Sequence, residues 1–320
     1  SPTGDPWPPG VVSAAAQAGV RIDRLVDAHA VVAAVLRSRP AFVLVNGAAR
    51  HPGGVEPAIG VVRALKADAY TAITPLLVVS TPDACAAWLG AGADEVLAGP
   101  DDATDGARLL AALRRSARDL AAQPTTRLPA AAAIDAEVER RIAAGVPFAA
   151  CYADLDHFKE FNDRYGFREG DRMIRVLGRV LHDAARGVAG DDGFVGHIGG
   201  DDFMLVLPLE AAEPACALAI EVFDTLVPLQ YSEADRRAGY YFGKDRRGQL
   251  HRVPLMSLSI GATTNARRRL RDAAEVARLA SEMKSFAKAR PGSVYAVDRR
   301  GDDDHPPAGV LHARPTPAHL

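Results

Sequence analysis

The 320-residue chain contains only three cysteines, Cys85, Cys151 and Cys216, and they lie far apart in the sequence. Isolated cysteines argue against a disulfide framework or a cysteine-rich metal site, and they suit a reducing compartment. No apolar run approaches the roughly 20 residues that a membrane-spanning helix needs, and no signal peptide is recognisable. The formal net charge of −2 gives no general attraction to nucleic acid or to an anionic membrane. We therefore expect a cytoplasmic protein with neither nucleic acid nor a membrane as its partner.

The most informative segment is the run Gly-Gly-Asp-Asp-Phe at residues 199–203. It lies between the apolar runs 194–198 and 203–207, which are typical of strands, so the two glycines predict a tight β-hairpin. Glycine allows positive φ and lets a bulky ligand approach the backbone. Two adjacent carboxylates at the tip suit Mg²⁺, whose shell is commonly completed by substrate phosphates. An ordinary acidic turn is the alternative, because Asp and Gly are both common in turns.

A second acidic segment follows the apolar run 149–153, which is typical of a buried strand. It begins an ordered series of motifs, which reads Asp154-Leu155-Asp156-His157-Phe158-Lys159, Asn162-Asp163, Tyr165-Gly166, Gly170-Asp171 and Gly199-Gly200-Asp201-Asp202-Phe203. Taken together, these motifs resemble the GGDEF domain, the catalytic module of diguanylate cyclases. The resemblance covers about residues 125–300, and Thr126-Arg127-Leu128-Pro129 loosely matches the segment that opens such domains.

This resemblance implies an α/β domain with a cyclase-like or palm-like central antiparallel sheet. It also implies a reaction in which two GTP molecules, one in each domain of a homodimer, condense to cyclic di-GMP and release two pyrophosphates. Each 3′-hydroxyl would attack the α-phosphate of the other nucleotide with the help of Mg²⁺ (or Mn²⁺). Such a transfer depends on in-line positioning and charge stabilisation more than on covalent help from the protein.

The resemblance further implies a role for each matching residue. The implied metal ligands are Asp154, the carbonyl oxygen of Leu155, and Asp201. The implied catalytic residues are Asp201, Asp202 and Lys288. The residues expected beside the β- and γ-phosphates are His157, Phe158 and Lys159. Their backbone N–H groups, rather than particular side chains, would hold the phosphates.

Asn162 and Asp171 match the pair that hydrogen-bonds the guanine edge in this family. An aspartate can accept from guanine N1 and N2, and adenine lacks that pair of donors, so Asp171 favours GTP over ATP. Simpler interpretations remain open at this point. Asn162 could mark a helix interruption, Asp171 could cap a helix that starts near Arg172, and Lys159 could be a solvated surface lysine.

The chain also departs from the family pattern at three places. Asp202 stands where Glu is usual, which keeps the charge but shortens its reach by one methylene. After Ala287-Lys288, the position of the usual arginine is Gly292. Lys284 and Lys288 are spaced i, i+4, so they could together contact the triphosphate, although a solvated basic helix face is the alternative. The product-binding Arg-x-x-Asp motif is replaced at 190–193 by a stretch without arginine, so we predict no product inhibition through that motif.

An insertion at residues 230–253 interleaves tyrosines and phenylalanine with arginines and lysine. Such a composition can bind nucleotides or single strands. A solvent-exposed hairpin is favoured, because long loops are commonly polar and irregular.

The N-terminal third alternates strand-like runs at 20–26, 41–45, 75–79 and 95–97 with helical stretches, which predicts a parallel α/β sheet. Parts of it resemble a response-regulator receiver domain of flavodoxin-like fold. Its phosphorylation chemistry is lost, because Asn46 stands at the phosphoacceptor position and Gly99 at the lysine position. Ser80, at the switch-hydroxyl position, then reads as a strand-end serine.

The sequence therefore predicts three parts, since a chain of this length with 48% apolar residues supports two cores. Residues 11–122 would be a pseudo-receiver that serves dimerisation or binds a protein partner. Residues 123–300 would be the GGDEF domain, and 301–320 a disordered tail. Two hypotheses remain: an active diguanylate cyclase, or a catalytically weak or inactive regulator that binds GTP or partner proteins.

Overall fold

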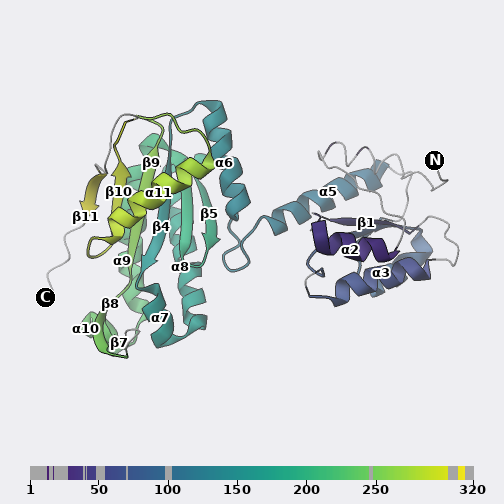
Figure 1. Ribbon diagram of the computed structural model, residues 1–320, viewed down its shortest axis with the longest axis horizontal. Helices are drawn as coiled ribbons and strands as arrows, with labels where there is room; N and C mark the ends of the chain where they lie inside the picture. The colour runs from purple at the N-terminus through teal and green to yellow at the C-terminus, as the bar shows by residue number, and fades with distance from the viewer. Residues whose placement is uncertain are drawn as a thin grey trace. The chain divides into compact units, whose positions relative to one another are not determined.

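The computed structural model describes residues 13, 17, 28–38, 40, 42–47, 55–69, 71–97, 103–244, 248–301 and 309–313. The chain divides into two compact units, Ser1–Leu120 and Ala121–Leu320 (Figure 1). Among the described residues, no helix is both long and apolar enough to cross a membrane.

The first unit contains a parallel sheet in the order β1-β2-β3, as the alternating sequence pattern predicts. Its strands are β1 (Val43–Asn46), β2 (Leu76–Val79) and β3 (Glu95–Leu97). Its helices are α2 (Ala28–Ser38), α3 (Glu56–Ala67), η1 (Pro82–Ala84), α4 (Cys85–Gly90) and α5 (Ala103–Leu120). The expected strand at 20–26 and Gly99 lie outside the described residues, and the receiver assignment stays a prediction.

Ser80 has a packing role that the sequence pattern did not indicate. It is fully buried, and its Oγ accepts a hydrogen bond of 2.9 Å from Nε1 of Trp88. Trp88 is also fully buried, in a cluster with residues of α3 and β2. The indole N–H is thereby satisfied inside the core, which is the usual condition for burying a tryptophan.

The second unit is built on a mixed, mainly antiparallel sheet in the order β11-β10-β9-β4-β6-β5. Only β9 and β10 run parallel to each other. The strands are β4 (Phe148–Asp156), β5 (Phe194–Gly199), β6 (Asp202–Pro208), β9 (Ser257–Thr264), β10 (Val294–Asp298) and β11 (Gly309–Ala313). The last strand differs from the expected disordered tail, because it pairs with β10; residues 302–308 and 314–320 lie outside the described part.

Helices cover both faces of this sheet (Figure 1). The helices are α6 (Ala131–Ala144), α7 (Phe158–Tyr165), α8 (Phe167–Ala189), η2 (Gly190–Asp192), α9 (Leu209–Leu226) and α11 (Ala273–Lys288). Cys151 and Leu155 of β4 pack with α8 and α9, whereas Phe148 and Ala150 pack with α6 and α11. Because side chains alternate along a strand, the later even-numbered residues of β4, which are Tyr152, Asp154 and Asp156, lie on the same sheet face as Phe148 and Ala150. This is the face that α11 covers.

The insertion folds into η3 (Val227–Gln230), α10 (Glu233–Ala238) and the hairpin of β7 (Tyr240–Lys244) and β8 (Leu250–Pro254). A hairpin forms as predicted, but the expectation of a wholly solvent-exposed one is wrong. Tyr231, Tyr241 and Val253 are at most 6% exposed and belong to the main core, while Phe242 and Leu250 are more than half exposed. The aromatic residues at the base of the insertion therefore serve packing, because they fill a gap beside α7.

Asp235 ties this insertion to α7 and supplies a pH-dependent test of its attachment. The carboxylate is buried and accepts hydrogen bonds from the Tyr165 hydroxyl and the Arg164 guanidinium. Burial alone would raise the pKa of Asp235, but these hydrogen bonds outweigh it and lower the pKa. A lowered pKa in the folded state contributes stability above the unfolded value of about 4, and this contribution is lost as the pH falls.

We expect Asp235→Asn to lower the free energy of unfolding by about 1–2 kcal/mol at pH 7, because hydrogen bonds to a charged group are lost. The difference should be smaller at pH 3 than at pH 7, because the contribution is lost as the pH falls through the lowered pKa of Asp235. Urea denaturation of both proteins at the two pH values measures it. Asp163→Asn, a change of an exposed carboxylate on α7, is the control and should show a much smaller difference. An Asp235→Asn effect of equal size at both pH values would contradict the role given to the charge.

Candidate active site

The predicted hairpin is present at the end of β5 and β6. Gly199 pairs with Asp202 across the turn, and the register shifts between His197 and Gly199. Gly200 has a φ of 59°, in the left-handed region where glycine avoids the strain of a side chain. This turn places Asp201 at the tip and Asp202 at the first position of β6.

His197 holds the tip in place from inside the protein. Its side chain is 2% exposed and stacks on Phe203 with ring centroids 4.3 Å apart. Nε2 lies 3.0 Å from the Gly200 carbonyl oxygen and Nδ1 lies 3.0 Å from the Thr126 Oγ1. A carbonyl only accepts, so Nε2 carries the proton and Nδ1 accepts from the threonine. Burial lowers the pKa of His197, which favours this neutral form.

Replacing His197 by Phe keeps a ring that can stack but removes both polar contacts. We expect the free energy of unfolding to fall by about 1–2 kcal/mol, because the Gly200 carbonyl and the Thr126 hydroxyl lose their partner. Urea denaturation measures this. The same substitution at His182, which is 43% exposed on α8, should change stability by less than about 0.5 kcal/mol. Equal losses of stability in the two variants would contradict the proposed role of His197 in holding the hairpin tip.

Asp154 is the centre of the polar cluster on the α11 face. Although it lies near the end of β4, it is only 6% exposed. Lys284 Nζ donates to its Oδ2 at 2.8 Å, and Lys288 Nζ lies 2.5 Å from its Oδ1. Burial would raise the pKa of Asp154, but the two lysines outweigh burial and hold the pKa below its usual value. The carboxylate is therefore kept ionised by cations from one helix.

Lys284 bridges the strand and the hairpin. Its Nζ also donates to Asp202 Oδ1 at 3.0 Å, and it lies 4.1 Å from the centre of the Tyr152 ring. Burial opposes its charged form, yet the hydrogen bonds to Asp154 and Asp202 outweigh burial and raise its pKa. In the structure its ammonium pairs with two carboxylates, and the role of Lys284 as a triphosphate ligand stays a prediction.

Asp156 belongs to the cluster, although the motif analysis gave it no role. Its Oδ2 accepts hydrogen bonds of 2.8 Å from the hydroxyls of both Ser257 and Ser259. Its Oδ1 lies 3.8 Å from Lys288 Nζ. Burial raises the pKa of Asp156. The signal that could have found it is strand alternation, since residues 152, 154 and 156 of one strand must share a face.

The two hairpin carboxylates stand in an environment that disfavours their charge. Burial, followed by the nearby Asp154, raises the pKa of Asp201 to about 6. Burial also raises the pKa of Asp202, and the hydrogen bond from Lys284 offsets this only in part. An added cation would relieve both effects.

The α7 helix begins where the sequence predicted phosphate contacts. His157 has a φ of 63° and precedes the first turn, in which Phe158 and Lys159 lie. Lys159 is 75% exposed and pairs with Asp163 at 2.8 Å, one turn later, so its side chain matches the surface-lysine alternative. The backbone N–H groups of this first turn have no partner within the helix. They are the groups to which the prediction assigned the phosphates.

Asn162 and Asp171 lie on two consecutive helices. Asn162 is inside α7 and Asp171 is inside α8, so the alternatives of a helix interruption and a helix cap are both wrong. Gly170 lets the helices meet, because a Cβ there would lie 1.8 Å from Asn162 Oδ1. That oxygen is buried without a hydrogen-bond partner among the described residues. Asp171, the next residue after Gly170, is exposed.

The stretch 190–193 contains no arginine, but the fold brings two arginines to it, one from α8 and one from α6. Arg186 Nη1 lies 2.6 Å from Asp191 Oδ1, and Arg141 donates to the Asp192 carbonyl oxygen at 2.5 Å. Spacing within the motif could not show these two contacts. The absence of product inhibition stays a prediction.

Residues 121–235, which contain Asp154 and the hairpin carboxylates, are similar to known proteins. Residues 121–235 match the family model described as "Diguanylate cyclase, GGDEF domain". Diguanylate cyclase DgcP of Pseudomonas aeruginosa is 32% identical over 94 residues, which is 28% of this chain and 13% of that protein. Diguanylate cyclase VdcA of Vibrio cholerae is 32% identical over 112 residues, which is 35% of this chain and 31% of that protein. The uncharacterized protein YhcK of Bacillus subtilis is 35% identical over 79 residues, or 25% and 21% of the two chains.

The chain thus spans less than a third of the length of each of these relatives. Among solved structures, the coiled coil and GGDEF domain of DgcB from Caulobacter crescentus, in complex with c-di-GMP, aligns with 60% of this chain and 94% of that chain. The sequence identity is 22% and the TM-score is 0.44. The segment that matches the family model contains both Asp154 and the Gly-Gly-Asp-Asp-Phe hairpin. In the structure, Lys284 joins Asp154 to this hairpin through Asp202. Residues 121–235 therefore form a GGDEF domain.

Proposed function

We propose that the protein is a diguanylate cyclase, which condenses two GTP molecules to cyclic di-GMP and two pyrophosphates. The observation that carries the proposal is the cluster of Asp154, Asp202, Lys284 and Lys288, which joins strand, hairpin and helix α11 through contacts of 2.5–3.0 Å. Carboxylates and lysines gathered at one place suit phosphoryl transfer, because that chemistry depends on positioning and charge stabilisation.

A nucleotide would be held by residues of α7, α8 and α11. The backbone N–H groups at the start of α7 are suited to the β- and γ-phosphates. The unpaired Oδ1 of Asn162 and the exposed carboxylate of Asp171 are acceptors that suit the amino and imino groups of guanine. Lys288, which is 36% exposed, can turn from Asp154 towards a triphosphate. These assignments favour GTP over ATP.

The donor set fits a divalent cation. Asp154 Oδ1 is buried and accepts no hydrogen bond of proper geometry from the described residues, although Lys288 lies close to it. Asp201 lies in surroundings that raise its pKa to about 6, which an added cation would reverse. Within the described residues, no group of three or more His, Cys, Asp or Glu side chains could hold a metal alone. Asp154, Asp201 and the Leu155 carbonyl would therefore hold Mg²⁺ or Mn²⁺ together with substrate oxygens. When bound, the cation supplies charge stabilisation to the phosphates.

The reaction needs two nucleotides facing each other, so we propose that two copies of the domain come together. Each 3′-oxygen forms a bond to the α-phosphorus of the opposite nucleotide, and the bond from that phosphorus to the bridging oxygen of pyrophosphate breaks. The hydroxyl proton is released in the same step. The N-terminal unit is proposed to promote this pairing or to bind a regulatory partner.

A second candidate is a GTP-binding regulator without turnover. It is favoured by the position of Lys284, whose ammonium is committed to Asp154 and Asp202, and by Asp202 itself, whose side chain is shorter than the usual glutamate. A displacement of about 1 Å can lower a rate by roughly 10²-fold where positioning carries catalysis.

One experiment separates the two candidates. The purified protein is incubated with GTP and Mg²⁺, with ATP and Mg²⁺ as the matched control, and the products are separated by chromatography. Cyclic di-GMP from GTP, with no cyclic dinucleotide from ATP, supports the cyclase. GTP binding without any product, lost in Asp171→Ala, establishes the regulator and rejects the cyclase.

A further inference from the structure

A concave surface that encloses about 900 Å³ lies far from the carboxylate cluster of the candidate active site, which comprises Asp154, Asp156, Asp201 and Asp202. Its lining residues are Ile142, Gly145, Asn265, Ala266, Arg267, Arg268, Arg269, Leu270 and Arg271. The loop that supplies most of them follows Thr264, the last residue of β9, whereas Ser257 at the other end of β9 contacts Asp156. Seven steps along a strand of about 3.3 Å each separate these ends by roughly 23 Å. The concave surface and the active site are thus two separate places.

Charge is distributed very unevenly over this surface. Four of the nine lining residues are arginines, and none is acidic, although the chain as a whole has a net charge of −2. A concave surface lined by charges of one sign concentrates their field and attracts ligands of the opposite sign. Its volume lies within the range of about 300–1,000 Å³ that is typical of small-molecule sites.

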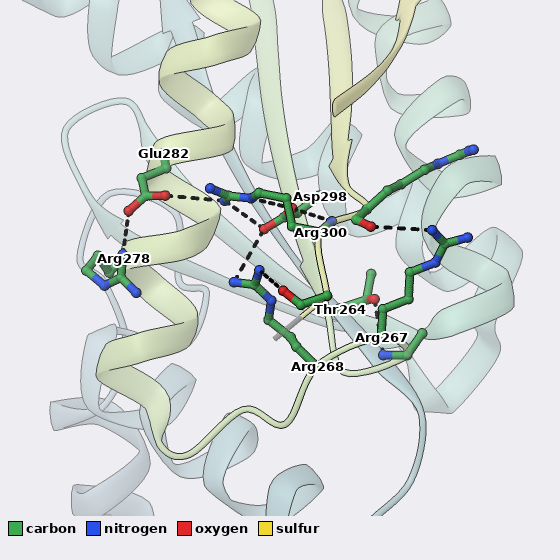
Figure 2. A network of polar contacts seen from close by, with 10 residues as sticks. Thr264, Arg267, Arg268, Arg278, Glu282, Asp298 and Arg300 are labelled. Atoms are coloured by element: carbon green, nitrogen blue, oxygen red, sulfur yellow. Dashed lines mark hydrogen bonds and ion pairs between the residues drawn. The ribbon is translucent and has the colours of Figure 1, made fainter. Parts of the chain in front are cut away.

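One of the arginines is fixed by a buried network that Figure 2 shows. Arg268 donates to the Gly301 carbonyl oxygen at 3.1 Å and lies 3.8 Å from Asp298 Oδ2. The carboxylate of Asp298 is 2% exposed and also accepts from Arg300, which in turn approaches Glu282 of α11 at 3.3 Å. A guanidinium held in this way keeps its orientation without a ligand, so less conformational entropy is lost on binding.

The remaining arginines are free to turn towards a ligand. Arg267 is exposed, and among the described residues its guanidinium makes a long hydrogen bond of 3.4 Å to the Arg299 carbonyl oxygen (Figure 2). Arg269 is exposed and makes no hydrogen bond or ion pair among the described residues. Arg271 is 82% exposed and lies 4.0 Å from Glu275, a separation at which an exposed pair contributes little. Three guanidiniums are therefore available beside the fixed one.

We propose that this surface binds a small ligand that carries two or more linked phosphate groups. Guanidinium forks recognise phosphate oxygens through paired, charge-assisted hydrogen bonds. Four arginines within five consecutive residues match several phosphates joined in one ligand better than a single phosphate. The small extent of this open concave surface, which one short loop lines for the most part, favours a small ligand over a nucleic acid, which needs an extended basic stripe. This binding requires neither the carboxylate cluster nor its turnover.

The test uses sodium tripolyphosphate as the probe, without a divalent metal, in isothermal titration calorimetry of the full chain. We expect binding by the unaltered protein and at least about tenfold weaker binding by the double variant Arg267→Gln/Arg269→Gln, because two charge-assisted contacts are removed. Both residues are exposed, so the variant should keep its melting temperature. The control is Arg172→Gln/Arg179→Gln, which removes two exposed arginines from α8 and should bind as the unaltered protein does.

The proposal is overturned if the unaltered protein does not bind, if Arg267→Gln/Arg269→Gln binds as the unaltered protein does, or if the two double variants lose affinity equally. Displacement of tripolyphosphate by a short DNA duplex at lower concentration would also overturn it, in favour of a nucleic-acid site. None of these outcomes depends on whether the protein makes cyclic di-GMP.

Discussion

Asp201→Asn is expected to lower the rate of cyclic di-GMP formation by about 10²–10³-fold, the size of loss seen when one group that stabilises developing charge is removed. Asparagine has nearly the same shape but no charge, so it would weaken the hold on a cation and on the phosphates around it. The rate is measured by chromatography of GTP incubations at fixed Mg²⁺. No ion pair joins the Asp201 side chain to a lysine among the described residues, so this variant should fold normally.

The matched control is Asp163→Asn, which removes an exposed carboxylate from α7 and should leave the rate within about twofold. Asp154→Asn supplies a second comparison. It should lower the rate as strongly and also lower the melting temperature, because Lys284 and Lys288 both lose their shared partner and a buried charge without its partner is costly. A rate for Asp201→Asn close to that of the unaltered protein would remove this residue from the proposed mechanism.

Gly261→Ala is expected to lower the free energy of unfolding by about 3 kcal/mol, at the upper end of the usual cost of overpacking a core. A Cβ at Gly261 of β9 would lie 1.9 Å from the backbone nitrogen of Lys284 and 2.4 Å from the carbonyl carbon of Met283. These are backbone atoms, so α11 itself must move away from the sheet. Urea denaturation measures the loss, and the same shift should reduce any cyclase activity because α11 carries both lysines.

Gly187→Ala serves as the control for that substitution. Gly187 lies in α8, and a Cβ there would have no atom within 4 Å. Alanine favours a helix by about 0.5–1 kcal/mol over glycine, so this variant should be slightly more stable. If Gly261→Ala instead proved neutral, the close approach of α11 to β9 would be wrong.

The local features of the domain could be predicted from the sequence, whereas its long-range contacts could not. The hairpin followed from two glycines between apolar runs, and the strand before Asp154 from its uninterrupted apolar residues. The sequence also placed Lys284 and Lys288 on one helical face. It gave no reason to expect their ammonium groups on Asp154 and Asp202, because that contact depends on how closely α11 packs on β9 at Gly261.

The insertion and the arginine-rich loop show the same contrast between local features, which the sequence predicts, and long-range contacts, which it does not. An alternation of aromatic and basic residues indicated a surface hairpin at 230–253, yet burial of Tyr231 and Tyr241 depends on a space beside α7 that no local pattern reveals. Similarly, the arginines between positions 267 and 271 are close together in the sequence. The orientation of one of them, Arg268, is however fixed by Asp298 and Gly301, some thirty residues later. Contacts of this kind arise from topology, which joins distant segments only after the sheet has formed.

Because Lys284 pairs with both Asp154 and Asp202, the three residues constrain which substitutions the site can accept during evolution. A substitution that removes the carboxylate at position 202 leaves part of a buried ammonium without its partner, and a substitution that removes the lysine leaves two carboxylates facing each other. Either change alone is destabilising, whereas a paired change leaves no unmatched group at position 202 or 284, and Asp154 keeps Lys288 as its partner. Among related sequences, the residues at positions 202 and 284 are therefore expected to vary together, so that one ancestral pair is exchanged for another as a unit.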